Sequence, residues 1–152
     1  MSHEPHILII DARFYEAIAD ELFAGASAAL LAAGASFDRI SVPGVLEIPA
    51  ALAMALEAAK SSYDGFVLLG CVIRGETGHY DIVAGQSARA IMDMTVRNAL
   101  ALGNGVLTVE STEQAWARAK TTEKNKGADA ASAALALIAL RGRFSSHQSA
   151  DR

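Results

Sequence analysis

Residues 66–73 read FVLLGCVI, the most apolar run of the chain, and residues 74–78 (RGETG) follow it directly. An uninterrupted apolar run of this length is typical of a strand that is buried on both faces of a parallel sheet. Ligands of open parallel sheets bind beyond the carboxyl ends of the strands. We therefore expect residues 66–73 to form the central strand and residues 74–78 to lie at the ligand-binding edge.

Strand-like and helix-like segments alternate on either side of this run. The sequence predicts further strands at residues 6–10, 36–42 and 106–109, and helices at residues 16–33, 47–60, 79–102, 112–119 and 129–140. Gly103 is expected to end the helix at residues 79–102. Alternation of this kind implies a parallel sheet covered by helices. The expected fold is therefore α/β: a flavodoxin-like three-layer α/β/α sandwich with a four-stranded parallel sheet. The glycine signature of dinucleotide-binding folds does not follow the first strand, so a Rossmann nucleotide-binding fold is not expected.

The length of 152 residues fits one domain, expected to span residues 1–152. We expect its ordered core to cover about residues 6–144 and its polar tail, residues 145–152, to be frayed. Thirteen basic and seventeen acidic residues give a net charge of −4 without a basic stripe. Nucleic acid and anionic membrane surfaces are therefore not expected as partners.

Cys71 is the single cysteine of the chain, which excludes an internal disulfide and a cysteine-based zinc site. Its place in the apolar run predicts an inert packing residue, because burial in apolar surroundings raises a thiol pKa. A lone cysteine fits a reducing compartment, and neither a signal-peptide pattern nor a membrane-length apolar stretch is found. The expected location is the cytoplasm.

The residues with chemical potential collect at the predicted strand ends. Phe14 follows the first strand, where an aromatic ring can stack on a flat heterocycle, although packing beneath the next helix explains it equally simply. Glu47 follows the second strand, where it can bind a polyol or merely favour a helix start. The glycines of residues 75–78 precede a helix, so this loop can hold phosphate on free N–H groups.

His79 is the single histidine at a predicted strand end, on the first turn of a helix beside that loop. A histidine there suits proton transfer near neutral pH, and the alternative is a half-buried structural histidine. Arg118 and Lys126 bracket a charged turn between the last two helices. They can form an anion clamp, or the turn can simply be solvated.

Taken together, these segments resemble the lumazine synthase family. The matching stretches occur in the family order and lie at residues 42–44 (VPG), 47–49 (EIP), 70–81 (GCVIRGETGHYD), 105–108 (GVLT), 113–115 (EQA), 118–119 (RA) and 125–127 (NKG). The resemblance implies a transferase of riboflavin biosynthesis. Its reaction condenses 5-amino-6-(D-ribitylamino)uracil with 3,4-dihydroxy-2-butanone 4-phosphate, giving 6,7-dimethyl-8-ribityllumazine, phosphate and water. The resemblance implies that neither a metal nor an organic cofactor takes part.

The resemblance also assigns the site residues. Those that correspond to pyrimidine and ribityl binding are Phe14, Val45, Leu46, Glu47, Val72, Ile73, Asn104 and Lys126. Those that correspond to phosphate binding are Gly75, Glu76, Thr77 and Arg118, and His79 corresponds to the proposed acid–base residue.

In this family the wall made by Asn104, Arg118 and Lys126 comes from the neighbouring subunit, which implies a homo-oligomer with shared sites. Two positions depart from the family pattern. Many members carry Phe where this chain has Asn104, and members that form icosahedral shells usually carry Gly-Thr-Lys-Ala-Gly where residues 119–124 read AKTTEK. We therefore expect a free homopentamer rather than a shell of 60 subunits.

Two alternatives share the fold. One is the archaeal type of riboflavin synthase, which has no butanone phosphate site, and the loop at residues 75–77 together with Arg118 argues against it. The other is a lumazine- or flavin-binding protein without catalysis. Retention of His79 and Arg118 argues against this alternative, whereas Asn104 leaves it open.

Overall fold

The computed structural model describes residues 4–58 and 62–150 of the chain. The strands are β1 (His6–Ala12), β2 (Ser36–Val42), β3 (Gly65–Ile73) and β4 (Leu102–Val109). The α-helices are α1 (Glu16–Ala32), α2 (Ile48–Ala58), α3 (His79–Arg97), α4 (Thr112–Ala119) and α5 (Lys126–Ala150), and a short 3-10 helix, η1 (Val45–Glu47), precedes α2. The alternation of strands and helices that the sequence predicts is confirmed.

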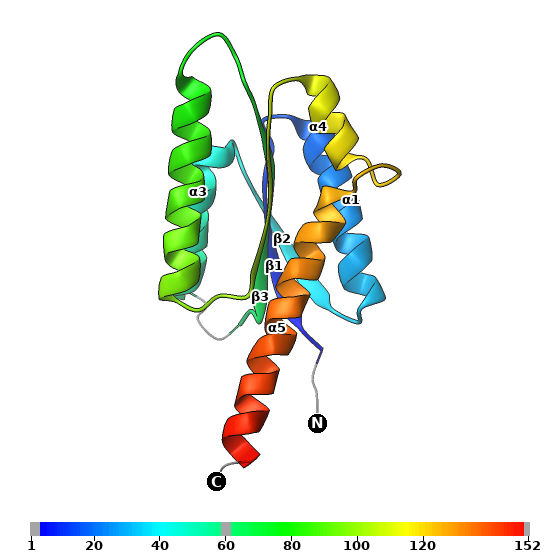
Figure 1. Cartoon of the computed structure of the whole chain (residues 1–152), viewed down its shortest axis with the longest axis vertical. Coiled ribbons are helices and arrows are strands. Elements are labelled where there is room, and N and C mark those ends of the chain that lie inside the picture. The colour runs from blue at the N-terminus through cyan, green and yellow to red at the C-terminus, as the bar shows by residue number, and fades with distance from the viewer. Residues whose placement is uncertain (1–3, 59–61, 151–152) are drawn as a thin grey trace.

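The four strands form one parallel sheet in the order β2-β1-β3-β4. Helices α2 and α3 cover one face, and α1, α4 and α5 cover the other (Figure 1). The predicted three-layer α/β/α sandwich with a four-stranded parallel sheet is therefore confirmed, with β3 in its interior. In the described part of the chain, none of the helices has the length and apolar character of a membrane span.

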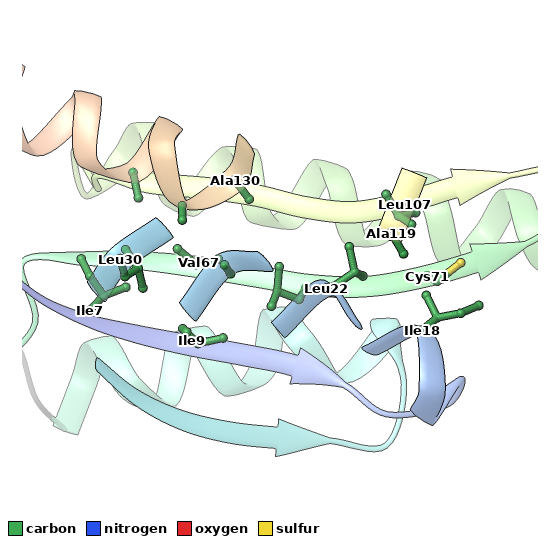
Figure 2. Packing of buried hydrophobic residues seen from close by; sticks show 14 of the residues in the cluster. Ile7, Ile9, Ile18, Leu22, Leu30, Val67, Cys71, Leu107, Ala119 and Ala130 are labelled. Carbon is green, nitrogen blue, oxygen red and sulfur yellow. The ribbon is translucent and has the colours of Figure 1, made fainter. Parts of the chain in front are cut away.

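The core consists of one apolar cluster on each face of the sheet. Successive side chains of β1 point to opposite faces, so Ile7 and Ile9 join one cluster while Leu8 and Ile10 join the other. Figure 2 shows Ile7 and Ile9 of the first cluster packed beneath the helices with Leu30 of α1. Both faces of the sheet are apolar because both are covered, which explains the uninterrupted apolar runs in the sequence.

The end of the third long helix differs from the prediction. Helix α3 ends at Arg97 rather than at residue 102, and the chain turns at Ala99, which has a φ of 50°. Strand β4 then begins at Leu102, four residues before the predicted start, so Gly103 lies inside a strand and does not end a helix. A Cβ at Gly103 would collide with the backbone of Ala130 in α5, so close packing explains this glycine.

The last helix also begins earlier and ends later than predicted. Helix α5 starts at Lys126 instead of residue 129, because Gly127 allows its first turn to touch the backbone of Leu22 in α1. It continues to Ala150, so the tail expected to fray from residue 145 is helical up to that point. Residues 151–152 of that tail lie outside the described residues.

Smaller differences affect two other predicted boundaries. The helix predicted at residues 47–60 begins as η1 and continues as α2 to Ala58, and residues 59–60 lie outside the described part. Strand β1 runs two residues past residue 10 and ends at Ala12. This extension places a charged side chain, Asp11, inside the buried sheet, where its exposure is 0%.

Candidate active site

A cavity of about 530 Å³ opens at the carboxyl ends of β1, β2 and β3. Nine of the predicted site residues line it: Phe14, Val45, Leu46, Glu47, Val72, Ile73, Gly75, Thr77 and His79. Glu76 belongs to the same loop and is exposed, but it is not among the lining residues. The structure therefore brings most of the predicted pyrimidine, ribityl and catalytic residues together around one opening.

Phe14 stands at the mouth of this cavity. Its side chain is 72% exposed, so the alternative in which it packs beneath the next helix is wrong. Tyr15 has that role instead: it packs against the core, and burial raises the pKa of its phenol. The two rings meet edge to face with their centroids 4.9 Å apart. One flat face of Phe14 is thus free to meet a planar ligand.

The end of β3 offers backbone hydrogen-bonding groups to the same cavity. The pairing of β3 with β1 ends at Leu69, whereas its pairing with β4 continues to Ile73. Val72 and Ile73 therefore pair with a strand on one side only, and both line the cavity. Their backbone polar groups can bind the edge of a flat heterocycle.

The segment that follows β2 forms another part of the cavity wall. Val45 is buried beneath the cavity, while Leu46 and Glu47 are exposed at its side. Glu47 occupies the last position of η1, just before α2 begins. Its carboxylate therefore stands at a helix start, as the simpler interpretation predicts, and also at the wall of the cavity.

The loop between β3 and α3 is anchored by Arg74, a residue that the sequence analysis did not select. Its Nε donates to Glu110 Oε2 at 3.0 Å, and its guanidinium lies 4.2 Å from the centroid of the Tyr80 ring. The bond to Glu110 raises the pKa of Arg74. An arginine directly after the central strand is the one available sequence signal for this role.

Beyond Arg74 the loop leads into the start of α3. Thr77 Oγ1 accepts a hydrogen bond from the backbone N–H of His79 at 3.3 Å, although Gly78 occupies the N-cap position itself. The loop thus sits at the amino end of a 19-residue helix, where backbone N–H groups and the helix dipole favour an anion.

His79 is the first residue of α3, and its side chain is exposed at the cavity wall. This exposure rules out the alternative of a half-buried structural histidine. A ring that is open to a ligand and lies at the start of α3 can exchange protons with that ligand.

The three remaining site residues, Asn104, Arg118 and Lys126, lie elsewhere on the chain. They line a second, smaller hollow of about 350 Å³ between β4, α4 and α5. Arg118 Nη1 donates to the backbone oxygen of Gln114 at 3.1 Å, and Lys126 Nζ lies 3.3 Å from Asp129 Oδ2. The two hollows share no lining residue, so a single chain presents the predicted site in two separate parts.

Cys71 lies in β3 at the floor of the first cavity. Cys71 packs in the core as predicted, and burial raises the pKa of its thiol to about 11, which disfavours the reactive thiolate. Within residues 4–58 and 62–150, no group of three or more His, Cys, Asp or Glu side chains is arranged to hold a metal ion.

Comparison with known proteins shows the family to which this chain is similar. The model of the 6,7-dimethyl-8-ribityllumazine synthase family matches residues 4–142. A 6,7-dimethyl-8-ribityllumazine synthase of Bartonella tribocorum is 62% identical over 144 residues, which cover 95% of each chain. The 6,7-dimethyl-8-ribityllumazine synthase 1 of Rhizobium meliloti is 61% identical and is aligned over 91% of this chain and 93% of its own. The 6,7-dimethyl-8-ribityllumazine synthase of Agrobacterium fabrum is 57% identical and is aligned over 93% of this chain and 97% of its own.

Proposed function

Because the chain belongs to the 6,7-dimethyl-8-ribityllumazine synthase family and is an enzyme of riboflavin biosynthesis, we propose that its active site forms between two copies of the chain. The reaction joins 5-amino-6-(D-ribitylamino)uracil to 3,4-dihydroxy-2-butanone 4-phosphate and releases the lumazine, phosphate and water. The observation that supports a shared site is the division of its residues between two hollows of one chain.

The first cavity binds the pyrimidine substrate. The exposed face of Phe14 stacks on the ring, and the one-sided backbone of Val72 and Ile73 meets the ring edge. The ribityl hydroxyls bind along Val45, Leu46 and Glu47. The carboxylate of Glu47 accepts hydrogen bonds from these hydroxyls.

The loop before α3 binds the phosphate of the second substrate. Gly75, Glu76 and Thr77 contribute backbone N–H groups at the helix start, and Thr77 adds its hydroxyl. Arg118 of a neighbouring copy completes this subsite with a planar cation that can bind two phosphate oxygens at once. Lys126 and Asn104 of that copy close the pyrimidine pocket.

His79 transfers protons during the condensation. The amine of the pyrimidine attacks the ketone to give a Schiff base, phosphate then leaves, the ring closes and water is lost. Each of these steps moves a proton, which a histidine can accept and return near neutral pH. Both reactants are reactive by themselves, so most of the acceleration comes from holding them in one orientation. The cationic clamp also stabilises the departing phosphate dianion.

A closed ring in which each copy contributes both halves supplies every site with one complete pair of hollows. We favour a homopentamer, since residues 119–124 lack the glycines of the shell-forming members. The single free cysteine is consistent with a reducing compartment such as the cytoplasm.

Mixed oligomers test the shared site. His79→Ala damages only the first cavity and Arg118→Ala only the second hollow. When the two variants are unfolded together in equal amounts and refolded as mixed rings, about a quarter of the interfaces pair two intact halves. We expect lumazine formation near that fraction of the unmutated rate. The assay uses butanone phosphate at a concentration below the KM of the Arg118→Ala variant, so that sites with the altered second hollow contribute little.

The matched control mixes His79→Ala with Phe14→Ala, two changes in the same cavity, and should show no recovery. Activity in the first mixture that merely equals the mean of the two parent variants would contradict a shared site. Full activity of the unmutated protein as a monomer would also contradict a shared site.

A further inference from the structure

Asp11 is a buried carboxylate in a strand whose other buried residues are apolar. Its exposure is 0%, and it lies in register with Ser41 of β2 on one side and Leu69 of β3 on the other. Side chains alternate along β1, so Asp11 points to the same face as Ile7 and Ile9, the face covered by α1. Asp11 is not among the residues that line the first cavity. A buried charge of this kind is costly unless partners compensate it.

The partners of Asp11 come from strand β2 and from the loop that follows β1. Ser41 donates its hydroxyl to Oδ1 at 2.5 Å, and Arg39 of the same strand donates from Nη2 to Oδ2 at 2.6 Å. Arg13, which follows β1 directly, donates from Nη1 to Oδ2 at 3.3 Å. Asp11 thus joins β2 to the first residue of the loop that carries Phe14.

Asp20 of α1 extends this cluster to a third element. Its Oδ1 accepts from Arg13 Nη1 at 2.8 Å and from Arg39 Nη2 at 3.2 Å. The hydrogen bond from Arg13 lowers the pKa of Asp20. Two carboxylates and two guanidinium groups therefore form one closed cluster, and Arg39 also lies 3.8 Å from the centroid of the Phe23 ring.

The cluster fixes the residue that immediately precedes Phe14. The backbone N–H of Arg13 donates to Val42 O at 2.9 Å, so both the main chain and the side chain of Arg13 are held. On the other side of Phe14, Tyr15 packs against the core. Phe14 itself is 72% exposed and its ring packs edge to face on Tyr15, so its direction depends on these two neighbours.

We propose that the cluster of Asp11, Arg13, Asp20 and Arg39 positions Phe14 and thereby determines how tightly the ribitylaminouracil substrate binds. This inference rests on the proposed function, in which Phe14 stacks on the pyrimidine. The four residues are positioning residues: they act through the loop and do not touch the substrate.

A double-mutant cycle between Arg13 and Phe14 tests the proposal on the full oligomeric enzyme. Arg13→Gln keeps a polar side chain but removes the charge that bonds Asp11 and Asp20. We expect it to raise the KM for the ribitylaminouracil by about threefold to tenfold, the range of one lost aromatic stacking contact. The KM for butanone phosphate and the kcat at saturation should change less than about twofold. Arg13→Lys keeps the positive charge, so it should raise the pyrimidine KM less than Arg13→Gln does.

The Phe14→Ala background separates positioning from general loosening. If Arg13 acts through Phe14, adding Arg13→Gln to Phe14→Ala should change the pyrimidine KM by less than about twofold. Arg141→Gln is the matched control, since Arg141 also bridges two segments, by donating to the backbone oxygens of Asp64 and Ala99. Its loss should leave both KM values unchanged.

The outcomes distinguish this proposal from the proposed function. If Phe14→Ala raises the pyrimidine KM but Arg13→Gln does not, the positioning role is wrong and the stacking role stands. If the effects of Arg13→Gln and Phe14→Ala multiply, or if Arg13→Gln raises both KM values together, the cluster does not act through Phe14. If Phe14→Ala leaves the pyrimidine KM unchanged, the stacking role and the positioning role both fall.

Discussion

The side-chain oxygen of Asn104 accepts a hydrogen bond from the backbone N–H of Val106, 2.9 Å away on the same strand. β4 lies at the edge of the sheet and pairs with β3 alone. This bond uses the oxygen of the amide and fixes its orientation, so the NH₂ group is the end that can donate to a ligand. Many members of the family have an apolar phenylalanine at this position.

Replacing Asn104 with phenylalanine should favour the pyrimidine ligand. In the proposed shared site, a phenylalanine at this position forms a second aromatic wall for the pyrimidine and adds a stacking contact, so we expect the KM for the ribitylaminouracil to fall by about twofold to tenfold. Loss of the bond to Val106 should lower the free energy of unfolding by about 1 kcal/mol. Steady-state kinetics and urea unfolding measure the two effects. A KM that rises instead would mean that the NH₂ group of Asn104 donates to the substrate.

Replacing His79 with alanine should slow the reaction without abolishing it. Positioning survives the change, whereas the proton transfers lose their positioned partner, so we expect kcat to fall by about 10²-fold. The KM values should change little. The measurement is kcat from lumazine absorbance with both substrates at saturation.

Two results would contradict this role for His79. A variant that folds and assembles normally but has no activity above the uncatalysed background would show that His79 does more than transfer protons. A kcat equal to that of the unmutated enzyme would show that it does not transfer them. His79→Gln is a useful companion, because it keeps a polar group of similar length but cannot take up a proton.

Replacing Arg118 with alanine should act mainly on the phosphate substrate. Loss of a cation with two donors weakens phosphate binding, so we expect the KM for butanone phosphate to rise by about tenfold or more. The KM for the pyrimidine should change much less. Lys124→Ala is the matched control, since Lys124 lies in the same charged turn but is not a lining residue of the second hollow. Equal effects of the two substitutions would indicate a general electrostatic attraction instead of a bound phosphate.

The sequence predicts the interior of this fold better than its boundaries. The runs that form β1 and β3 are apolar because both faces of the sheet are covered, and that property is local. Gly103 and Gly127 suggest breaks, because glycine often ends helices. In the structure both glycines serve close backbone contacts, with Ala130 and Leu22, which only the packed helices create.

The first half of the site is predictable for a similar reason. Parallel strands place their carboxyl ends at one edge, so the sequence alone indicates that Phe14, Glu47 and His79 meet there. The division into two hollows does not follow from residue patterns, because it depends on α4 and α5 packing on the face opposite α3 (Figure 1). The cluster around Asp11 does not follow from them either. Its charges lie on three elements, and their spacing along the chain gives no sign that they meet.

A contact between α1 and the start of α5 gives a prediction about stability. Gly25 lies in the middle of α1, and a Cβ there would collide with the side-chain oxygen of Asn125. Alanine usually stabilises a helix interior relative to glycine, but here the overlap should dominate. We expect Gly25→Ala to lower the free energy of unfolding by about 1–3 kcal/mol. Gly142→Ala is the control, since a Cβ at Gly142 of α5 meets open space. Thermal unfolding should show a loss for the first variant and no loss for the second.

The buried thiol of Cys71 predicts how stability changes in alkali. Burial raises its pKa from about 9 to about 11, so the folded protein holds this proton more tightly than the unfolded chain. Below pH 9 both states are protonated, and the thiol causes no pH dependence. Between pH 9 and pH 11 only the unfolded chain loses the proton, so the free energy of unfolding falls by about 1.4 kcal/mol per pH unit.

Urea unfolding of the unmutated protein and of Cys71→Ala at pH 8, 9 and 10 isolates this contribution, because the other titrating groups are present in both. The stability difference between the two proteins should shift in favour of the variant as the pH rises, and parallel pH profiles would show that the thiol is not held protonated by burial.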